Sequence, residues 1–300
     1  MTTNPPDAPE GPRERGEAAD PGKSAAEPGE RRFLFRGGGF SPIAPLADDR
    51  EHLLVADSWL VADGRVRAID LHRERFVRSA LESGYTNRTI LDAFWAAIVE
   101  AIPPVHRWFP RAELSVVHAA PGSAEPRFQL SLRMRLAPKP ISTAVLRNLG
   151  GGDPRSIPAV KGPDLHVLTA LRNGARAEGI DDLVILADDG TIIDGTTTAV
   201  LWWRGGNLHL PPASLTRVDS VTARSIVVLA RATGVAVIEE PAKPTDLFGA
   251  EVWAVNALHG IRAVTAWRDD AERPGAGGLR VDAARAGLWQ RRLDSLAWPI

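Results

Sequence analysis

The sequence predicts an α+β protein built from two domains. Short strand-like runs separated by turns recur in both halves of the 300-residue chain, and each half also contains a few helix-like segments. A stretch rich in proline and glycine, residues 138–152, separates the halves, and such stretches favour a crossing between domains. We therefore expect a first domain over residues 33–140, an interdomain linker over 141–156 and a second domain over 157–300.

Residues 1–32 are expected to form a disordered tail. They contain six prolines and four glycines but no Leu, Ile, Val, Phe, Trp or Tyr. This composition cannot bury enough apolar surface to offset the entropy that is lost on ordering.

Turn and cap residues divide the first domain into elements. Asp63-Gly64 favours a hairpin between two strands, Asp70 is expected to cap the first helix, and Pro103-Pro104 ends the second helix. In chain order we expect strand 52–61, strand 65–69, helix 70–83, helix 87–102, strand 113–119 and strand 127–136.

The second domain is expected to begin with a helix and to continue with hairpins. Turns at Asp189-Gly190 and Gly205-Gly206 separate short apolar strands. In chain order we expect helix 163–178, strand 182–186, strand 191–193, strand 199–203, strand 208–210, helix 221–233, strand 235–239, strands within 251–267 and a last helix from about residue 281.

Composition excludes several classes of function. The 36 Lys and Arg residues are balanced by 37 Asp and Glu residues, a net charge of −1, which argues against nucleic acid and anionic membranes as partners. Without cysteine the chain has no disulfide, thiolate nucleophile or Cys-based metal site, and no metal ligand is assigned. No apolar run reaches the roughly 18 residues that span a membrane, and the N-terminus lacks a hydrophobic signal core. A cytoplasmic protein is therefore predicted.

Lys161 is the first candidate for chemistry. It is one of only four lysines, and it stands between an apolar segment and Gly162-Pro163, where a helix begins. A lysine that is held at a strand end and partly desolvated can lose its proton and attack a carbonyl, forming a Schiff base. A solvent-exposed lysine beside a helix is the open alternative.

Three polar segments are further candidates. Asp194 precedes Gly195 and three threonines in a bend, where its carboxylate could bind a cationic ring nitrogen. Ser220-Val221-Thr222 begins a helix, and free N–H groups there favour a phosphate. Arg75, on the first predicted helix, could bind a phosphate in bidentate fashion. Ordinary turn bonds, an N-cap and a solvated helix face are the open alternatives, and taken alone each of the first two segments favours its ordinary explanation.

In this order, the segments resemble the fold type IV family of pyridoxal-phosphate enzymes, the class IV aminotransferases. That family includes branched-chain aminotransferases, D-amino-acid aminotransferases and aminodeoxychorismate lyases. The resemblance runs from about Asp63 to Trp267 and is strongest from Val160 onward. It implies a two-domain D-amino-acid aminotransferase-like fold, pyridoxal 5'-phosphate as cofactor in the interdomain cleft, and a homodimer.

The resemblance also implies roles for single residues. Lys161 would be the catalytic Schiff-base lysine, and Asp194 would pair with the pyridine nitrogen of the cofactor. The segment Asn256-Ala257-Leu258-His259 is similar to the late active-site segment of the lyases. The remaining cofactor contacts would come from Arg75, Thr197, Thr198, Val221, Thr222 and Ala257, and substrate contacts from Asn256, His259 and Arg262.

Departures from the family pattern concern mainly the substrate side. The family normally has Glu at the position of Asp194, and a Gly-Asp-Gly-containing strand where this chain has His52-Leu53-Leu54. The expected activity is transfer of an amino group between an amino acid and a 2-oxo acid. One alternative is an aminodeoxychorismate lyase that forms 4-aminobenzoate and pyruvate; another is a non-catalytic scaffold protein of the same fold. Retention of both Lys161 and Asp194 argues against the scaffold.

Overall fold

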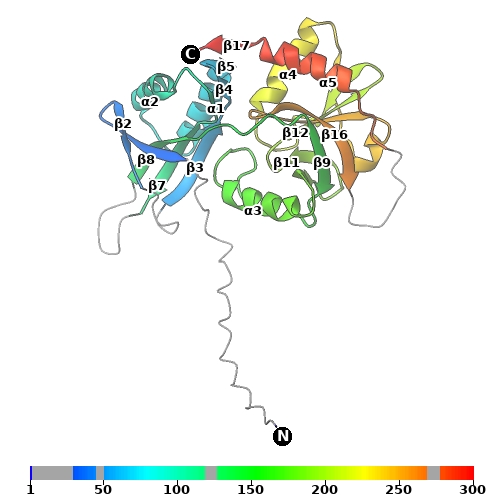
Figure 1. Ribbon diagram of the computed structural model, residues 1–300, viewed down its shortest axis with the longest axis horizontal. Helices are drawn as coiled ribbons and strands as arrows, with labels where there is room; N and C mark the ends of the chain where they lie inside the picture. The colour runs from blue at the N-terminus through cyan, green and yellow to red at the C-terminus, as the bar shows by residue number, and fades with distance from the viewer. Residues whose placement is uncertain (2–29, 45–50, 119–126, 269–277) are drawn as a thin grey trace.

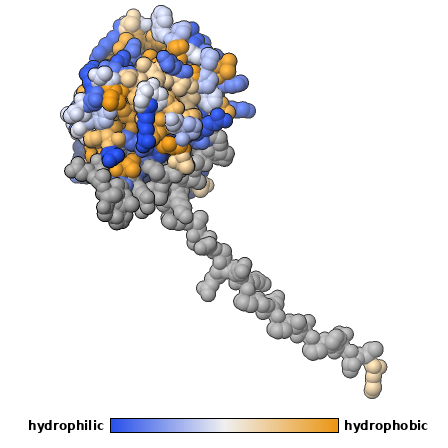
Figure 2. Space-filling model, turned by 90° about the vertical axis from the view of Figure 1, so that its left-hand side faces the viewer, coloured by the Kyte–Doolittle hydropathy of each residue, from blue (hydrophilic) through white to orange (hydrophobic). Residues whose placement is uncertain are grey.

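The computed structural model describes Met1 and residues 30–44, 51–118, 127–268 and 278–300. Its strands form two groups that lie side by side (Figure 1), one with helices α1 and α2 and the other with helices α3, α4 and α5. Seen from the side of the first group, the surface intermixes apolar and polar residues (Figure 2). None of the helices in these ranges combines the length and the apolar composition that a membrane crossing requires.

An antiparallel sheet of five strands organises the first group, in the order β2-β1-β8-β7-β3. Helices α1 and α2 pack against it through a core that includes Phe76, Leu91 and Phe94. The elements are β1 (Arg31–Arg36), β2 (Gly39–Pro42), β3 (Glu51–Ser58), α1 (Ile69–Glu82), α2 (Arg88–Ala101), β7 (Arg111–Val117) and β8 (Arg127–Met134). A smaller sheet joins β17 (Ala297–Pro299), β5 (Arg65–Arg67), β4 (Val61–Ala62) and β6 (Arg107–Trp108) in this order.

A sheet of eight strands organises the second group, in the order β11-β10-β9-β16-β15-β12-β13-β14. Helices α4 and α5 pack on one face through Ile226, Trp289 and Leu293, and α3 lies on the opposite side (Figure 1). The elements are β9 (Thr143–Asn148), α3 (Leu165–Arg176), β10 (Asp182–Leu186), β11 (Ile192–Gly195), β12 (Ala199–Arg204), β13 (Asn207–Leu210), α4 (Val221–Ala232), β14 (Val237–Glu239), the 3-10 turn η1 (Pro244–Leu247), β15 (Glu251–Asn256), β16 (Gly260–Arg268) and α5 (Ala283–Asp294).

Two segments that were expected to lack regular structure form strands. Arg31 and Arg32, at the end of the expected tail, belong to β1, where buried Arg32 pairs with Glu51. Residues 143–148 of the expected linker form β9, which pairs in parallel with β10 and β16 in the middle of the second sheet. The flanking prolines and glycines therefore mark the two ends of a strand. The rest of the tail, residues 2–29, lies outside the described residues.

The start of α1 and the end of the chain also differ from expectation. Asp70 lies in the first turn of α1 and does not cap it; Ala68 precedes the helix in the left-handed conformation, with φ 50° and ψ 44°. At the C-terminus, the sequence analysis does not predict β17, which pairs with β5. The other expected elements are present with ends shifted by a few residues, and Asn87 caps α2 as its position suggests. Ala119, the expected end of a strand, lies outside the described residues.

Candidate active site

A cavity of about 2340 Å³ lies between the two groups of strands. Its wall contains almost all of the residues that the sequence analysis singled out. These are Arg75, Lys161, Asp194, Thr197, Thr198, Val221, Thr222, Asn256, Ala257 and His259. Arg262 is not among the lining residues; it is only 1% exposed and lies behind the wall. Within the described ranges, no group of three or more His, Cys, Asp or Glu side chains is arranged to hold a metal ion.

Close contact with β3 fixes the backbone at Lys161. The carbonyl of Lys161 accepts a hydrogen bond from Ala56 N–H at 2.7 Å. Gly162 has a φ of +151°, and a Cβ added there would lie 2.8 Å from both Leu54 O and Val55 Cα. Only glycine allows such an approach of two backbones. The lysine is therefore held where the second group of elements touches the first.

The amine of Lys161 loses its proton more readily than that of an ordinary lysine. Burial lowers the pKa of Lys161 to about 8, and the nearby positive charges of Arg75 and Arg111 act in the same direction, against Asp57 and Asp194. Its Nζ makes no hydrogen bond or ion pair with any residue that the structure describes, and it borders the cavity. With such a pKa, roughly one amine in ten is neutral at pH 7, against fewer than about one in a thousand for an ordinary lysine.

We expect the rate of covalent capture of an aldehyde by Lys161 to follow this pKa. Only the neutral amine attacks a carbonyl, so the rate constant should rise about tenfold per pH unit below pH 8 and level off above it. Stopped-flow absorption with pyridoxal 5'-phosphate between pH 6 and pH 10 measures it. A rate that keeps rising to pH 10 would show that the pKa of this lysine is that of an exposed amine.

A buried carboxylate orients Arg75. Asp57, on β3, is fully buried and accepts hydrogen bonds from Nε and Nη2 of Arg75, both at 2.8 Å, and lies 2.7 Å from Nδ1 of His72. Burial favours the protonated carboxyl, but Arg75 and His72 outweigh it and hold the pKa of Asp57 well below its usual range. The guanidinium is thus fixed in direction by a charge-assisted bidentate pair.

Arg75 and the first turn of α4 form one anion site. Nη1 of Arg75 donates to the carbonyl of Asp219 at 2.7 Å, immediately before the helix cap Ser220. The cap side chain accepts from Ala223 N–H, which leaves the N–H groups of Val221 and Thr222 without a partner within the helix. The positive end of a 12-residue helix and a cation therefore meet at the cavity wall, an arrangement that suits a phosphate.

Asp194 supplies a buried carboxyl that can form an ion pair with a cation in the cavity. It lies at the end of β11, is buried, and accepts one hydrogen bond from Gly195 N–H at 3.1 Å. Burial raises its pKa to about 7, although the positive charges of Arg155 and Arg217 oppose the rise; Nη1 of Arg155 is 3.9 Å away. A cationic N–H inside the cavity would ionise this carboxyl and pair with it.

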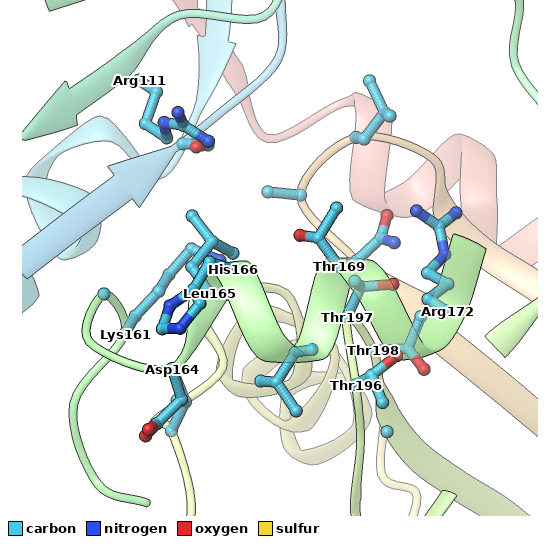
Figure 3. Close-up of a pocket in the computed structure, with 18 of the residues that line it drawn as sticks. Arg111, Lys161, Asp164, Leu165, His166, Thr169, Arg172, Thr196, Thr197 and Thr198 are labelled. Atoms are coloured by element: carbon cyan, nitrogen blue, oxygen red, sulfur yellow. The ribbon is translucent and has the colours of Figure 1, made fainter. Parts of the chain in front are cut away.

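The three threonines after Gly195 donate hydrogen bonds to a carboxylate of the protein itself. Asp182, fully buried at the start of β10, accepts hydrogen bonds from the hydroxyls of Thr196, Thr197 and Thr198 and from the N–H of Thr197. A Cβ at Gly195 would lie 2.4 Å from the hydroxyl of Thr198, so the loop closes tightly around the carboxylate. The threonine hydroxyls therefore shape the loop, while the residues still line the cavity (Figure 3).

The turn between β15 and β16 closes another part of the wall. Asn256 Oδ1 accepts a hydrogen bond from His259 N–H at 2.9 Å. Burial, with the charges of Arg262, Arg172 and Arg176, lowers the pKa of His259 to about 4, so its imidazole is neutral near pH 7. Its Nδ1 lies 3.4 Å from the N–H of Ile141 and accepts from it. This contact ties the turn to the segment that connects the two groups of elements.

Three site residues are missing from the sequence analysis. Asp57 is the one acidic residue between Leu53 and Ala62, an apolar stretch, and this isolation is a signal that sequence reasoning can use. Asp182 gives a weaker signal, as an acid that opens an apolar strand. Arg111 gives none, because it is positioned by the pairing of β7 with β8, where Glu113 accepts from Arg111 and Arg133.

Known proteins are similar to this chain in sequence and in fold. The sequence profile of the family described as amino-transferase class IV matches residues 54–267. A protein of Methanocaldococcus jannaschii assigned as a branched-chain-amino-acid aminotransferase is 29% identical over 94 residues, which are 31% of this chain and 33% of that protein. The match thus spans about a third of the length of this relative.

Two solved structures have the same fold at low identity. An aminotransferase from Brucella abortus bound to the cofactor PLP is 16% identical, with a TM-score of 0.70 over 87% of this chain and 98% of the other. A protein of Legionella pneumophila assigned as a 4-amino-4-deoxychorismate lyase is also 16% identical, with a TM-score of 0.72 over 85% of this chain and 96% of the other. At these identities the likeness establishes the fold alone.

Proposed function

Because the chain belongs to the class IV aminotransferase family, we propose that it is a pyridoxal-5'-phosphate-dependent enzyme that transfers an amino group between an amino acid and a 2-oxo acid. One observation carries the proposal: Lys161, an unpartnered amine with a pKa near 8, shares a cavity with Asp194, a buried carboxyl with a pKa near 7. Perturbed acids and bases that face one cavity are typical of active sites.

The residues present fit this cofactor. Arg75 and the N–H groups of Val221 and Thr222 would hold its phosphate, together with the backbone at Ala257. Asp194, as a carboxylate, would accept a hydrogen bond from the protonated ring nitrogen and keep it protonated. Thr197 and Thr198 would contribute through the loop that they shape, because their hydroxyls are bound to Asp182. When bound, the cofactor supplies the electron sink that stabilises the negative charge developing on the substrate carbon.

Lys161 is proposed as the group that moves the proton. Its neutral amine can accept a proton from the substrate α-carbon and return it to a neighbouring carbon. The pKa near 8 suits both directions at neutral pH, because neither form of the amine is rare. A bound cation would keep Asp194 fully ionised at neutral pH, where burial raises its pKa to about 7.

Substrate contacts are proposed at two places in the cavity wall: at Arg111 on β7 and at the turn between β15 and β16. Asn256 and His259 line the cavity there. Arg111, with 22% of its side chain exposed, faces the cavity above Lys161 (Figure 3). Among the described residues its one hydrogen bond runs from Nε to Glu113, at 2.8 Å. Its remaining N–H groups can donate to a carboxylate in bidentate fashion. We assign to Arg111 a carboxylate contact, in place of the substrate contact that the sequence analysis expected from Arg262.

A lyase activity is the second candidate. The segment Asn256-Ala257-Leu258 and the fold shared with the Legionella protein favour a lyase. A lyase and a transaminase of this family would use the same lysine, so the products must separate them. We further propose a cytoplasmic homodimer, with the division into two domains falling near Ile141, just before β9; the dimer rests on the family resemblance alone.

Product analysis tests the proposed function. With the cofactor-loaded protein and a mixture of amino acids, we expect 2-oxo acids to form beyond the molar amount of the protein only when a 2-oxo acid acceptor is added. Liquid chromatography with mass detection measures the products. Pyruvate and 4-aminobenzoate formed from aminodeoxychorismate without any acceptor would establish the lyase instead. A protein that binds the cofactor and converts neither substrate class would be the non-catalytic scaffold.

A further inference from the structure

Two arginines on the cavity face of α3 lie apart from the proposed cofactor contacts. Arg172 and Arg176 both line the cavity, and residues four apart share one face of a helix. Like charges at this spacing destabilise a helix. Arg176 stands in the last turn, where the helix dipole favours a cation, but the dipole does not explain Arg172.

Arg172 keeps most of its donors free. Its Nε donates to the carbonyl of Asp181 at 2.9 Å, and within the described ranges its two Nη atoms make no hydrogen bond or ion pair. Burial lowers the pKa of Arg172, and the charge of Arg176 adds to this effect, against the attraction of Asp182 and Asp181. A half-buried guanidinium with free Nη atoms is a bidentate donor without an acceptor.

Arg262 adds a third cation behind this wall. It is 1% exposed, and its Nε and Nη2 are buried without a hydrogen-bond partner among the residues that the structure describes. The nearby carboxylates are engaged elsewhere: Asp182 binds the threonine loop, and Asp181 accepts from Val145 N–H at 2.8 Å. Buried donors without acceptors are rare and costly. This end of the cavity therefore has positive charge whose N–H donors are partly free of acceptors among the described residues.

This charge lies away from the reacting lysine. Figure 3 shows Lys161 and Arg111 toward one end of α3 and Arg172 toward the other, with Thr169 and the threonine loop between them. From Leu165 to Arg172 the helix advances about 10 Å, at 1.5 Å per residue. A carboxylate held by Arg111 would therefore leave Arg172 unoccupied unless the bound molecule is long.

We propose that Arg172 and Arg176 form a second anion subsite, and that the amino compound converted here has a carboxylate or phosphate at the end far from its amine. The proposal rests on the proposed function and extends it by naming the class of substrate. Arg111 would hold the near anionic group, and the subsite on α3 the distal one. Arg262 would add long-range attraction from behind the wall.

Binding of paired carboxylates to the cofactor-loaded protein tests the subsite. Suberate and octanoate have the same chain length but two and one carboxylates, and loading with pyridoxal 5'-phosphate occupies the site at Arg75. By calorimetry we expect suberate to bind at least about tenfold more tightly than octanoate, because a free bidentate arginine is available at each end. Glutarate, which is too short to reach both ends, should show a much smaller advantage over pentanoate.

Variants on α3 test whether the preference for suberate over octanoate depends on Arg172 and Arg176. We expect Arg172→Gln to reduce the preference for suberate to about twofold or less, and Arg176→Gln to weaken it severalfold. Arg176 is exposed, so its variant keeps the test valid if Arg172→Gln does not fold. Arg231→Gln, at an exposed position of α4 outside the cavity, is the matched control and should leave the preference intact. Equal binding of suberate and octanoate, or a preference that survives both α3 variants, would overturn the proposal.

Failure of the subsite differs from failure of the proposed function. Calorimetry needs no turnover, so an intact, Arg172-dependent preference for suberate without amino transfer would refute only the proposed activity. Amino transfer from simple amino acids with no preference for suberate would refute only the subsite. Inorganic phosphate, titrated against the same protein, distinguishes a subsite that prefers phosphate from one that prefers a carboxylate.

Discussion

Replacement of Lys161 by alanine is expected to lower kcat/KM for amino transfer by about 10⁴-fold or more, because the variant loses both the attacking amine and the proton carrier. No other described lysine is placed to substitute for it, since Lys139 and Lys243 do not line the cavity. Steady-state assays with the preferred amino donor measure the loss. Binding of the cofactor should persist, because the anion site at Arg75 remains.

A matched lysine provides the control for this variant. Lys139 is exposed and lies near the cavity without lining it. Lys139→Ala should therefore retain kcat/KM within about twofold, as surface substitutions usually do. Far-UV circular dichroism and thermal unfolding of both variants show whether each folds. Activity of Lys161→Ala within tenfold of the unaltered protein would contradict the assigned role.

Asp194→Asn is expected to have the second largest effect, a loss of about 10² to 10³-fold in kcat. The amide cannot pair with a ring nitrogen as an ion, so the cofactor would withdraw electrons less strongly from the substrate. Asp194→Glu keeps the carboxylate and restores the residue usual in the family, and it should retain more activity than the Asn variant. Equal activities of these two variants would show that the charge has no role.

Asp194→Asn should lower activity but raise the free energy of unfolding of the cofactor-free protein. The folded-state pKa of Asp194, about 7, lies above its unfolded value near 3.8. The folded protein therefore binds the extra proton between these two values, and stability falls as pH rises through this window. At pH 8 we expect Asp194→Asn to raise the free energy of unfolding by on the order of a few kcal/mol, and at pH 4 to change it little. Urea unfolding at the two pH values measures the difference.

Much of the fold follows from local patterns in the sequence. The hairpin at Asp63-Gly64, the cap at Asn87 and helix α4 are where turn and cap chemistry place them. What local patterns do not reveal is β9, a six-residue strand between proline- and glycine-rich segments. Its strand conformation is specified by pairing with β10 and β16, which are distant in sequence. β17 is likewise specified by β5 alone.

The candidate site divides in the same way. Lys161 and Asp194 stand in segments whose residue order resembles a known family, so the sequence predicts them as site residues, and both line one cavity in the structure. The pairing of Asp57 with Arg75 depends on β3 packing against α1, and no spacing rule predicts it. Charge alone suggests a substrate contact for Arg262, but in the structure this residue of β16 is buried and does not line the cavity.

Location of the bound cofactor on a single residue tests the central claim most directly. The protein is mixed with pyridoxal 5'-phosphate, reduced with borohydride, digested, and the peptides are analysed by mass spectrometry. We predict one phosphopyridoxyl group per chain, on the peptide that contains Lys161, and none in Lys161→Ala. A label that is absent, or that is shared among several lysines and unchanged in Lys161→Ala, would contradict the assignment of this cavity as a pyridoxal-phosphate site.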